Sequence, residues 1–354
     1  MKLWEENIRK VIPYVPGEQP KEDGIIKLNT NENPYPPTPK VTQAASEFDM
    51  DTLKLYPDPD ASALVNVLAD YYHLNRDQVY VGVGSDDVIA MAFMTYFNSD
   101  KPILFPDISY SFYNVWADLY KIPYERPALD DKFNIIASDY YKENGGVIFP
   151  NPNAPTAVYT ELDVVEDIIK HNQDVVVIVD EAYIDFGGKS AKGLIDKYEN
   201  LLVVQTFSKS RSMAGMRIGY AMGNKELIKA LNDVKFSFNS YTMNATSLAY
   251  GVEAVKDDEY FKATIDKIIK TREVAKKRLA ELGFSFTESK ANFIFATHEK
   301  IKAREIFGKL KEKHIYVRYF DLPRIDNYLR ITVGTDEEMR ALSVALEEIV
   351  GEQR

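Results

Sequence analysis

Lys209 stands between two serines, directly after an apolar segment of strand length, LLVVQTF at 201–207. Five of the seven residues in that segment are apolar, which is typical of a buried strand. A lysine in a loop is usually solvated and has no chemical role. A lysine kept out of water close to other cations, such as Arg217, can instead form a Schiff base with a carbonyl compound.

Asp180 ends a second apolar segment, DVVVIVD at 174–180, and is followed by Glu181 and Tyr183. Burying a carboxylate at the end of a strand costs free energy unless a cation pairs with it. These acidic residues can also cap a following helix, which requires no ligand. If a ligand provides the cation, its positively charged group is expected to lie against Asp180.

Three other segments also place polar or aromatic groups directly after apolar runs. GVGSDD at 82–87 opens a predicted helix, and its glycines allow a phosphate to approach the N–H groups of the helix N-terminus. An ordinary turn with a helix cap has the same appearance. Tyr110 can stack on a planar ligand or pack in the interior. Asn153, in FPNPNAPTA at 149–157, can contact a ligand oxygen or only stabilise its turn.

Apolar runs of strand length alternate with segments of helical periodicity up to about residue 250. This alternation predicts right-handed crossovers and a mostly parallel sheet with helices on both faces. Ligands of such sheets bind beyond the carboxyl ends of the strands, so the candidate groups are expected to share one edge. The predicted strands lie at 79–84, 102–105, 146–149, 174–180 and 200–207.

A ligand that satisfies all these groups needs a phosphate, a planar ring, a cationic ring atom and a carbonyl carbon. Pyridoxal 5′-phosphate (PLP) has all four, since its aldehyde reacts with a lysine and its ring nitrogen pairs with an aspartate. The order of the candidate groups along one sheet edge therefore predicts a PLP site, with Lys209 as its reactive amine.

The rest of the chain predicts a second, smaller unit and an arm. A long charged helical region at 252–282 precedes strand-like segments and a final helix whose capping box is Thr335 with Glu338. The segment 13–40 contains seven prolines and is expected to be an ordered extended arm. We predict an arm at 1–40 that contacts the small domain or a dimer partner, a large PLP-binding domain at 41–250 and a small α+β domain at 251–354.

Composition excludes several classes of function. A net charge of −11 argues against nucleic acid and anionic membranes as partners. The chain has no cysteine, which excludes disulfides and thiol nucleophiles, and its four histidines lack zinc-site spacing, so no metal is expected. The residues MKLWEENIRKVIPY lack a signal-peptide core and no apolar run reaches membrane-span length, so we expect a cytoplasmic protein.

Ten short motifs resemble those of the fold-type I, PLP-dependent aminotransferases of the class II aminotransferase family. The resemblance covers nearly the whole chain, and within the family it is to the branch that acts on histidinol phosphate. It implies an α/β fold, with a mostly parallel seven-stranded sheet in a large domain and a smaller α+β domain. The motifs are VIPY (11–14), LNTNENPY (28–35), LYPD (55–58), GSDD (84–87), SY (109–110), NPNAPT (151–156), DEAYIDF (180–186), TFSKSRSMAGMRIGY (206–220), YVRYF (316–320) and YLRITVGT (328–335).

The resemblance assigns roles to the cofactor contacts. It implies that Lys209 forms the Schiff base with PLP and moves the substrate proton as general base and acid. It implies that Asp180 keeps the ring nitrogen protonated, that Tyr183 bonds the ring hydroxyl and that Tyr110 stacks on the ring. The cofactor phosphate is expected to bind the backbone amides of Ser85 and Asp86 and the side chains of Thr206, Ser208 and Arg217.

One departure from the family concerns the turn NPNAPTA, where the family usually has NPNNPTG. Ala154 stands where the family has the asparagine that contacts the ring hydroxyl. Asn153, one residue earlier, is the substitute that we expect, and the alternative is that no residue takes this role.

The resemblance also implies a homodimer with shared active sites, in which Tyr56 reaches the cofactor phosphate of the other subunit. Arg318 and Arg330 can hold a phosphate or a carboxylate in fork geometry, which gives an acidic protein the local positive site that an anionic substrate needs. The substrate is expected to contact Tyr14, Asn31, Tyr241, Asn244, Arg318 and Arg330.

The activity implied by the resemblance is transamination of L-histidinol phosphate with 2-oxoglutarate, giving imidazole acetol phosphate and L-glutamate in histidine biosynthesis. The partners are then a small-molecule amino donor and a 2-oxo acid. Aromatic or broad-specificity aminotransferases and threonine-phosphate decarboxylases share this fold and would use the same arginines. A non-catalytic PLP-sensing module is a further alternative, but such regulators usually carry an added DNA-binding segment, and the motifs here occupy nearly the whole chain.

Overall fold

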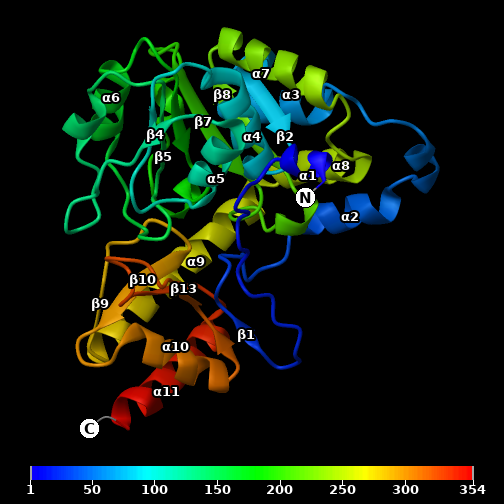
Figure 1. Cartoon of the computed structure of the whole chain (residues 1–354). Coiled ribbons are helices and arrows are strands. Elements are labelled where there is room, and N and C mark those ends of the chain that lie inside the picture. Colours follow the sequence, from blue (N-terminus) through cyan, green and yellow to red (C-terminus); the bar gives the residue numbers. More distant parts are fainter. Residues whose placement is uncertain (1, 353–354) are drawn as a thin grey trace.

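Buried strands rich in valine, isoleucine and leucine form a seven-stranded sheet in the larger part of the molecule (Figure 1). The computed structural model describes residues 2–352. Six strands point the same way and β8 is antiparallel to both of its neighbours, which confirms the predicted mostly parallel sheet. The strand order is β2 (Val79–Gly82), β8 (Gly219–Gly223), β7 (Leu201–Thr206), β6 (Val177–Asp180), β5 (Val147–Pro150), β3 (Ile103–Leu104) and β4 (Tyr124–Glu125).

Helices cover both faces of this sheet, because successive side chains of a strand point to opposite faces. Leu201 and Val203 of β7 lie in one core, and Leu202 and Val204 lie in the other. Each fully buried leucine or valine contributes about 1.5–3 kcal/mol, so the two cores hold the strand ends firmly in place. The first core includes α3 (Ser62–Tyr72), α6 (Leu162–Lys170) and α8 (Ala245–Lys256), and the second includes α4 (Ser85–Tyr96), α5 (Phe112–Tyr120) and α7 (Lys225–Phe238).

A four-stranded antiparallel sheet forms the centre of the smaller unit. The helical region expected at 252–282 is two helices, because Asp257 ends α8 and caps α9 by accepting a hydrogen bond from the Tyr260 amide. The capping box predicted at Thr335 and Glu338 is confirmed at the start of α11. The elements are β12 (Arg318–Tyr319), β13 (Leu329–Thr332), β10 (Phe293–His298) and β9 (Phe284–Phe286), with α9 (Asp258–Glu281), α10 (Ala303–Glu312) and α11 (Asp336–Gly351).

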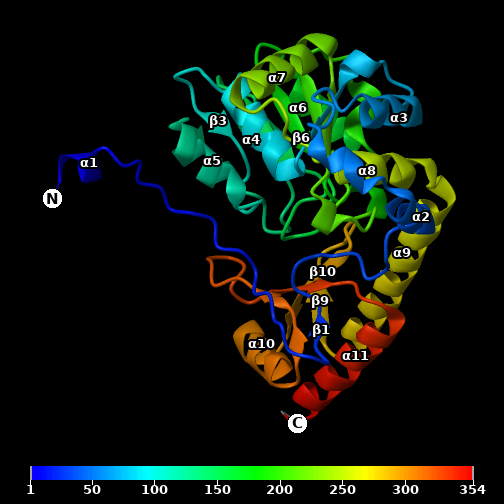
Figure 2. The same cartoon turned by 90° about the vertical axis from the view of Figure 1, so that its right-hand side faces the viewer.

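The N-terminal arm is mostly extended, and Figure 2 shows its first residues, with α1 (Leu3–Glu6), projecting away from both units. Farther along, β1 (Ile26–Lys27) pairs in parallel with β11 (Ile315–Tyr316) of the smaller unit. The arm ends where α2 (Pro39–Glu47) begins at a proline, a residue well suited to the first helical turn. No helix between residues 2 and 352 has both the length and the apolar composition that a membrane crossing requires.

Between residues 2 and 352, six short 3₁₀ helices connect the larger elements, and two of them follow strand ends beside the active-site segments. The one after β6 places Phe186 in the core of the smaller unit, and the one after β7 follows the turn that contains Lys209. They lie at Met50–Lys54, Arg76–Gln78, Ala137–Tyr140, Ile184–Phe186, Ala191–Leu194 and Ala214–Met216.

Glu181, the residue after β6, lies at the centre of a buried hydrogen-bond network. Its carboxylate accepts bonds from the Ser190 hydroxyl at 2.5 Å, the Ala191 amide at 2.6 Å and Gln205 Nε2 at 2.8 Å. Burial raises the pKa of Glu181 to about 7, although these three hydrogen bonds lower it and the nearby charge of Asp185 raises it further.

The native protein is expected to lose stability as the pH rises, and Glu181→Gln should abolish this loss. The folded-state pKa lies above the ordinary value of 4.5, so the folded protein holds this proton more tightly and loses stability between about pH 4.5 and pH 7. The gap between the two pKa values corresponds to about 3 kcal/mol. Urea unfolding measures this effect. The free energy of unfolding of Glu181→Gln, relative to that of the native protein, should be higher near pH 8 than near pH 5.

Glu143→Gln is the matched control, because Glu143 is an exposed carboxylate paired with Lys101 and contributes little to stability. Its free energy of unfolding should follow that of the native protein at both pH values. If the free energy of unfolding changed equally with pH in Glu181→Gln and in the native protein, the Glu181 carboxyl would ionise in the folded state as easily as in water.

Candidate active site

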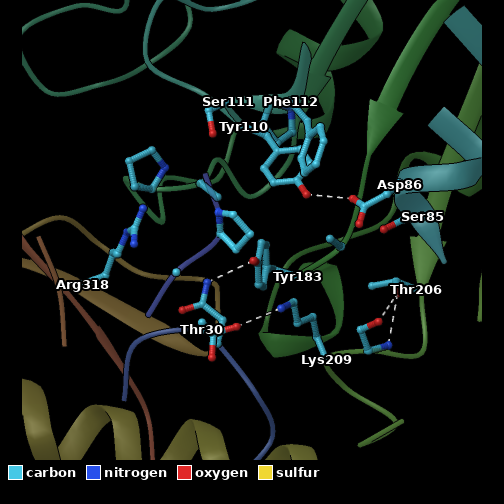
Figure 3. Close-up of a pocket in the computed structure, with 18 of the residues that line it drawn as sticks. Thr30, Ser85, Asp86, Tyr110, Ser111, Phe112, Tyr183, Thr206, Lys209 and Arg318 are labelled. Atoms are coloured by element: carbon cyan, nitrogen blue, oxygen red, sulfur yellow. Dashed lines mark hydrogen bonds between the residues drawn. The ribbon is translucent and has the colours of Figure 1, made fainter. Parts of the chain in front are cut away.

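A cavity of about 470 Å³ lies beyond the carboxyl ends of β2, β5, β6 and β7, and the arm and the smaller unit complete its wall (Figure 3). The sheet edge therefore brings together most of the residues selected from the sequence. Those that line the cavity are Tyr14, Asn31, Ser85, Asp86, Tyr110, Asp180, Tyr183, Thr206, Ser208, Lys209, Arg217, Arg318 and Arg330.

Lys209 enters the cavity from the turn that follows β7. Its Nζ donates a hydrogen bond to the Thr30 carbonyl at 3.2 Å and lies 5.7 Å from the centre of the Tyr183 ring (Figure 3). Within residues 2–352, no carboxylate forms an ion pair with this amine. One backbone oxygen is a weak competitor for the amine, so Lys209 is available for a ligand carbonyl.

Asp180 is buried at the last position of β6, and no cationic side chain of residues 2–352 lies beside it. Its carboxylate accepts hydrogen bonds from the Tyr113 hydroxyl at 2.7 Å and from the Ala182 amide at 3.3 Å. Burial raises the pKa of Asp180 to about 6, the charge of Asp86 adds to this effect, and the two hydrogen bonds oppose it. A positively charged ring nitrogen would lower the cost of the buried carboxylate, which fits the expected ligand.

The first turn of α4 forms a cradle for an anion. Gly84 has a φ of +88°, and β8 passes so close that a Cβ atom on Gly219 would lie 2.2 Å from the Ser85 amide nitrogen. Arg217 lies beside the same turn, with Nη2 3.3 Å from Asp86 Oδ2. The helix N-terminus, the exposed amides and the arginine together match the requirements of a phosphate group.

Hydroxyl groups complete this end of the cavity. Thr206 Oγ1 accepts a hydrogen bond from the Ser208 amide at 3.1 Å, and its hydroxyl donates to Ser208 Oγ at 3.1 Å. Tyr110 donates from its hydroxyl to Asp86 Oδ1 at 2.7 Å (Figure 3). Burial, together with the charge of Asp86, holds the pKa of Tyr110 well above its ordinary value, so the ring stays neutral and suited to stacking.

Arg318 and Arg330 are direct partners across the β12–β13 pair, so both guanidinium groups belong to the same small patch of sheet. Arg330 donates from Nη2 to the Asn29 carbonyl at 2.9 Å, and its buried Nε has no hydrogen-bond partner. Burial lowers the pKa of Arg330, and the charge of Arg318 contributes to the same shift. Neither arginine has an ion-pair partner in the described part of the chain, and together they favour an anionic ligand.

Besides Asn153, three predicted residues, Tyr56, Tyr241 and Asn244, lie outside this cavity. Tyr56 is 81% exposed and stacks on the Tyr241 ring, with the ring centroids 4.6 Å apart. Asn244 caps α8 and accepts a hydrogen bond from the Ser247 amide at 2.7 Å. Neither Tyr241 nor Asn244 lines this cavity, so their contacts with substrate stay predictions.

The ring-hydroxyl contact expected of Asn153 stays a prediction, although the structure gives its amide other partners. Its Nδ2 donates to the Ile108 carbonyl at 3.0 Å and to Thr156 Oγ1 at 2.8 Å, so the amide stabilises the turn. Ala154 lines the cavity and Asn153 does not. The Asn31 amide lies next to another expected ring contact, because its Nδ2 donates to the Tyr183 hydroxyl at 3.0 Å.

Sequence reasoning missed two functional contacts. Tyr113 bonds Asp180 from the first turn of α5, and its position three residues after Tyr110 could have indicated that both face the sheet edge. Thr30 acts through its backbone carbonyl on Lys209. A carbonyl contact leaves no trace in residue type, so no sequence pattern identifies it.

The sequence model of the aminotransferase class I and II family matches residues 23–346. The histidinol-phosphate aminotransferase of Clostridium botulinum (strain Okra / Type B1) is 51% identical over 349 residues, covering 99% of each chain. That of Lactococcus lactis subsp. lactis (strain IL1403) is 51% identical over 336 residues, covering 95% of this chain and 93% of the relative. A solved histidinol-phosphate aminotransferase from Sinorhizobium meliloti, in complex with pyridoxal-5′-phosphate, has a TM-score of 0.84 at 23% identity, covering 93% and 92% of the two chains.

The solved structure shares the fold, and the sequence relatives share about half of their residues with this chain from end to end. The family model covers both the large sheet and most of the smaller unit. The cavity at the sheet edge lies within the matched region, apart from its arm residues before 23. The chain belongs to the aminotransferase class I and II family.

Proposed function

We propose that this chain is a PLP-dependent aminotransferase that converts L-histidinol phosphate and 2-oxoglutarate into imidazole acetol phosphate and L-glutamate. The observation that carries this proposal is the Arg318–Arg330 pair, which shares a cavity with Lys209 and has no acidic partner within residues 2–352. The end-to-end identity with curated histidinol-phosphate aminotransferases supports the choice of substrate.

The residues of the cavity fit PLP at each of its functional groups. Lys209 is available for the aldehyde, Asp180 for the ring nitrogen and Tyr110 for the face of the ring. Tyr183 is suited to the ring hydroxyl, with Asn31 orienting its phenol. We assign the phosphate to the cradle formed by the Ser85 and Asp86 amides, Thr206, Ser208 and Arg217.

When bound, PLP supplies an electron-withdrawing ring that stabilises negative charge at the substrate Cα. Lys209 Nζ accepts the proton from that carbon and later returns a proton to the substrate, because no carboxylate holds the amine elsewhere. Asp180 stabilises positive charge on the group that lies against it. Arg318 and Arg330 bind the phosphate of the amino donor in one half of the reaction and a carboxylate of 2-oxoglutarate in the other.

The same proposal includes a cytoplasmic homodimer. Leu53, Leu55 and Tyr56 are large exposed apolar or aromatic residues in one short segment, which suits a surface that another subunit covers. We infer that Tyr56 contacts the cofactor phosphate of the partner subunit. A phosphorylated substrate cannot cross a membrane unaided, which favours the cytoplasm. We retain the division into an arm at 1–40, a large domain at 41–250 and a small domain at 251–354.

An amino-donor panel tests the proposed function. We expect turnover of L-histidinol phosphate with 2-oxoglutarate, and a kcat/KM at least about 100-fold lower for L-histidinol, which lacks the phosphate that two charged arginines would bind. Glutamate formation measures the reaction. Phenylalanine as the better donor would support a broad-specificity aminotransferase, and release of CO₂ from threonine phosphate would support a decarboxylase.

A further inference from the structure

Residues 28–33, here called the strap, run between β1 and α2 and lie against the smaller unit. The Leu28 carbonyl accepts a hydrogen bond from the Thr332 amide at 3.0 Å. The Asn31 amide donates to Thr332 Oγ1 at 3.0 Å, and the Asn31 carbonyl accepts from Asn292 Nδ2 at 3.0 Å. These bonds fix the backbone of the strap on β13 and its neighbouring loop.

The strap also holds Lys209 at both of its ends. At the side-chain end, the Thr30 carbonyl accepts the hydrogen bond from Lys209 Nζ. At the backbone end, Asn33 Nδ2 donates to the Lys209 carbonyl at 3.0 Å and to the Ser210 carbonyl at 3.3 Å. Asn33 Oδ1 accepts from the Tyr35 amide at 3.0 Å, which fixes the direction in which the amide points.

The lysine turn has further supports on the opposite side, from the larger unit and from the start of α9. Ser210 donates from its hydroxyl to Asp185 Oδ2 at 2.6 Å. The Arg211 guanidinium donates to the Ala254 carbonyl at 2.8 Å and packs 4.0 Å from the centre of the Phe261 ring. The Lys209 carbonyl itself accepts only a long 3.5 Å bond from the Ser212 amide in addition to the bond from Asn33. The backbone position of Lys209 therefore depends on Asn33 more than the positions of Ser210 and Arg211 do.

We propose that Asn33 is a positioning residue for Lys209, which acts through the lysine backbone and never touches substrate. Asn33 is absent from the cavity wall, although its neighbours Asn29 to Glu32 line it. A side-chain amide suits this place because its two N–H groups can bond two successive carbonyls, which a hydroxyl or a carboxylate cannot do. The proposal rests on the proposed function, since it concerns the reactive amine of that site.

The hydrogen bonds from Asn33 fix the position of the Lys209 amine for catalysis. Proton transfer at the substrate Cα requires the Lys209 amine within hydrogen-bond reach of that carbon, and misplacement by about 1 Å can cost on the order of 100-fold in rate. Loss of the Asn33 bonds frees the carbonyl end of the lysine turn but leaves the Asp185 and Arg211 supports intact. We therefore expect a loss of about tenfold in kcat, with little change in KM, because the substrate contacts remain.

Two variants separate this role from the folding of the strap. Asn33→Ala removes the bonds to the lysine turn and the local bond from the Tyr35 amide. Asn33→Ser keeps a hydroxyl that can accept from the Tyr35 amide but is too short to reach the two carbonyls. Both variants should lose about tenfold in kcat with histidinol phosphate, at a KM within about twofold of the native value.

Asn98→Ala is the matched control. Asn98 Nδ2 also donates to two backbone carbonyls, those of Met94 at 3.0 Å and Thr95 at 2.9 Å, but at the end of α4 and outside the cavity wall. Its replacement should leave kcat unchanged.

A second measurement does not depend on turnover. In the full chain without PLP, acetic anhydride modifies exposed lysine amines, and mass spectrometry follows the peptide that contains Lys209. Release of the lysine turn should increase the rate of Lys209 acetylation several-fold in both Asn33 variants and leave the native rate in Asn98→Ala. Thermal unfolding confirms that each variant is folded at the temperature of the measurement.

Three outcomes would overturn the inference. Native kcat and native Lys209 acetylation in Asn33→Ala would show that the bonds do not hold the lysine. Full activity in Asn33→Ser would show that only the strap turn matters. A raised KM at unchanged kcat would place Asn33 in substrate binding. If the native protein fails to use histidinol phosphate, the proposed function fails, and the acetylation rates still decide the role of Asn33.

Discussion

Lys209→Ala is expected to lower the kcat of transamination by on the order of 10⁴-fold, the largest effect of any single substitution in the cavity. The substitution removes both the amine that reacts with the cofactor aldehyde and the base that moves the substrate proton. The cradle at α4, Asp180 and the stacking face of Tyr110 all remain, so the variant should still bind PLP. Stopped-flow spectroscopy of the bound cofactor and steady-state glutamate formation measure the two effects separately.

Lys192→Ala is the control for this substitution. Lys192 also donates from Nζ to a backbone carbonyl, that of Tyr72 at 2.8 Å, and lies 5.8 Å from the centre of the Tyr72 ring. Its surroundings resemble those of Lys209, but it lies outside the cavity wall. Lys192→Ala should keep the native kcat. A Lys209→Ala protein that retained a tenth or more of the native kcat would mean that another group moves the proton, and the assigned mechanism would be wrong.

Asp180→Asn is expected to lower kcat by on the order of 10³-fold, which corresponds to about 4 kcal/mol of lost transition-state stabilisation. Asparagine has the same shape and can still accept the hydrogen bond from Tyr113, so the packing around β6 should survive. It carries no charge with which to hold a proton on the cofactor ring. Cofactor affinity and kcat should therefore fall together, as measured by PLP titration and glutamate formation.

The same substitution should stabilise the protein when PLP is absent. The pKa of Asp180 is raised from 3.8 to about 6, so the folded protein loses stability as the pH rises through this interval and the carboxylate ionises. Asparagine does not ionise, so thermal unfolding near pH 8 should give a higher midpoint for Asp180→Asn than for the native protein without cofactor.

Tyr113→Phe separates the two effects, because it removes the hydrogen bond to Asp180 and keeps the charge. We expect it to lose only about tenfold in kcat, the usual cost of one hydrogen bond to a charged group. An Asp180→Asn protein with native kcat would show that the ring nitrogen needs no charged partner in this site.

The sequence was sufficient to predict the residues that follow buried strands. Lys209, Asp180 and Ser85 each come directly after an apolar run, and parallel strands place their carboxyl ends at one edge, so local pattern and topology agree. The sheet itself followed from the same pattern. The strands β4 and β9, of two and three residues, are too short to show a periodicity and were not predicted.

The contacts that sequence could not provide are those set by the direction of a side chain or by a distant carbonyl. Asn153 has the residue type for a ligand contact, but its amide donates a hydrogen bond to the Ile108 carbonyl of a neighbouring loop. Asn244 has the type for a substrate contact and is used as a helix cap. Asn33 reaches Lys209 across 176 positions of the chain, a separation that no local pattern spans.

The close approach of Gly219 to the Ser85 amide has a consequence for how the protein matures during synthesis. The cradle at the start of α4 is complete only when β8 has inserted between β2 and β7, although β2 and α4 leave the ribosome much earlier. A nascent chain that has not yet reached residue 217 lacks both the strand that closes the cradle and Arg217. We therefore expect the protein to bind a phosphate-bearing cofactor only late in its synthesis. Binding of the cofactor would then indicate that the last strand of the large sheet is in place.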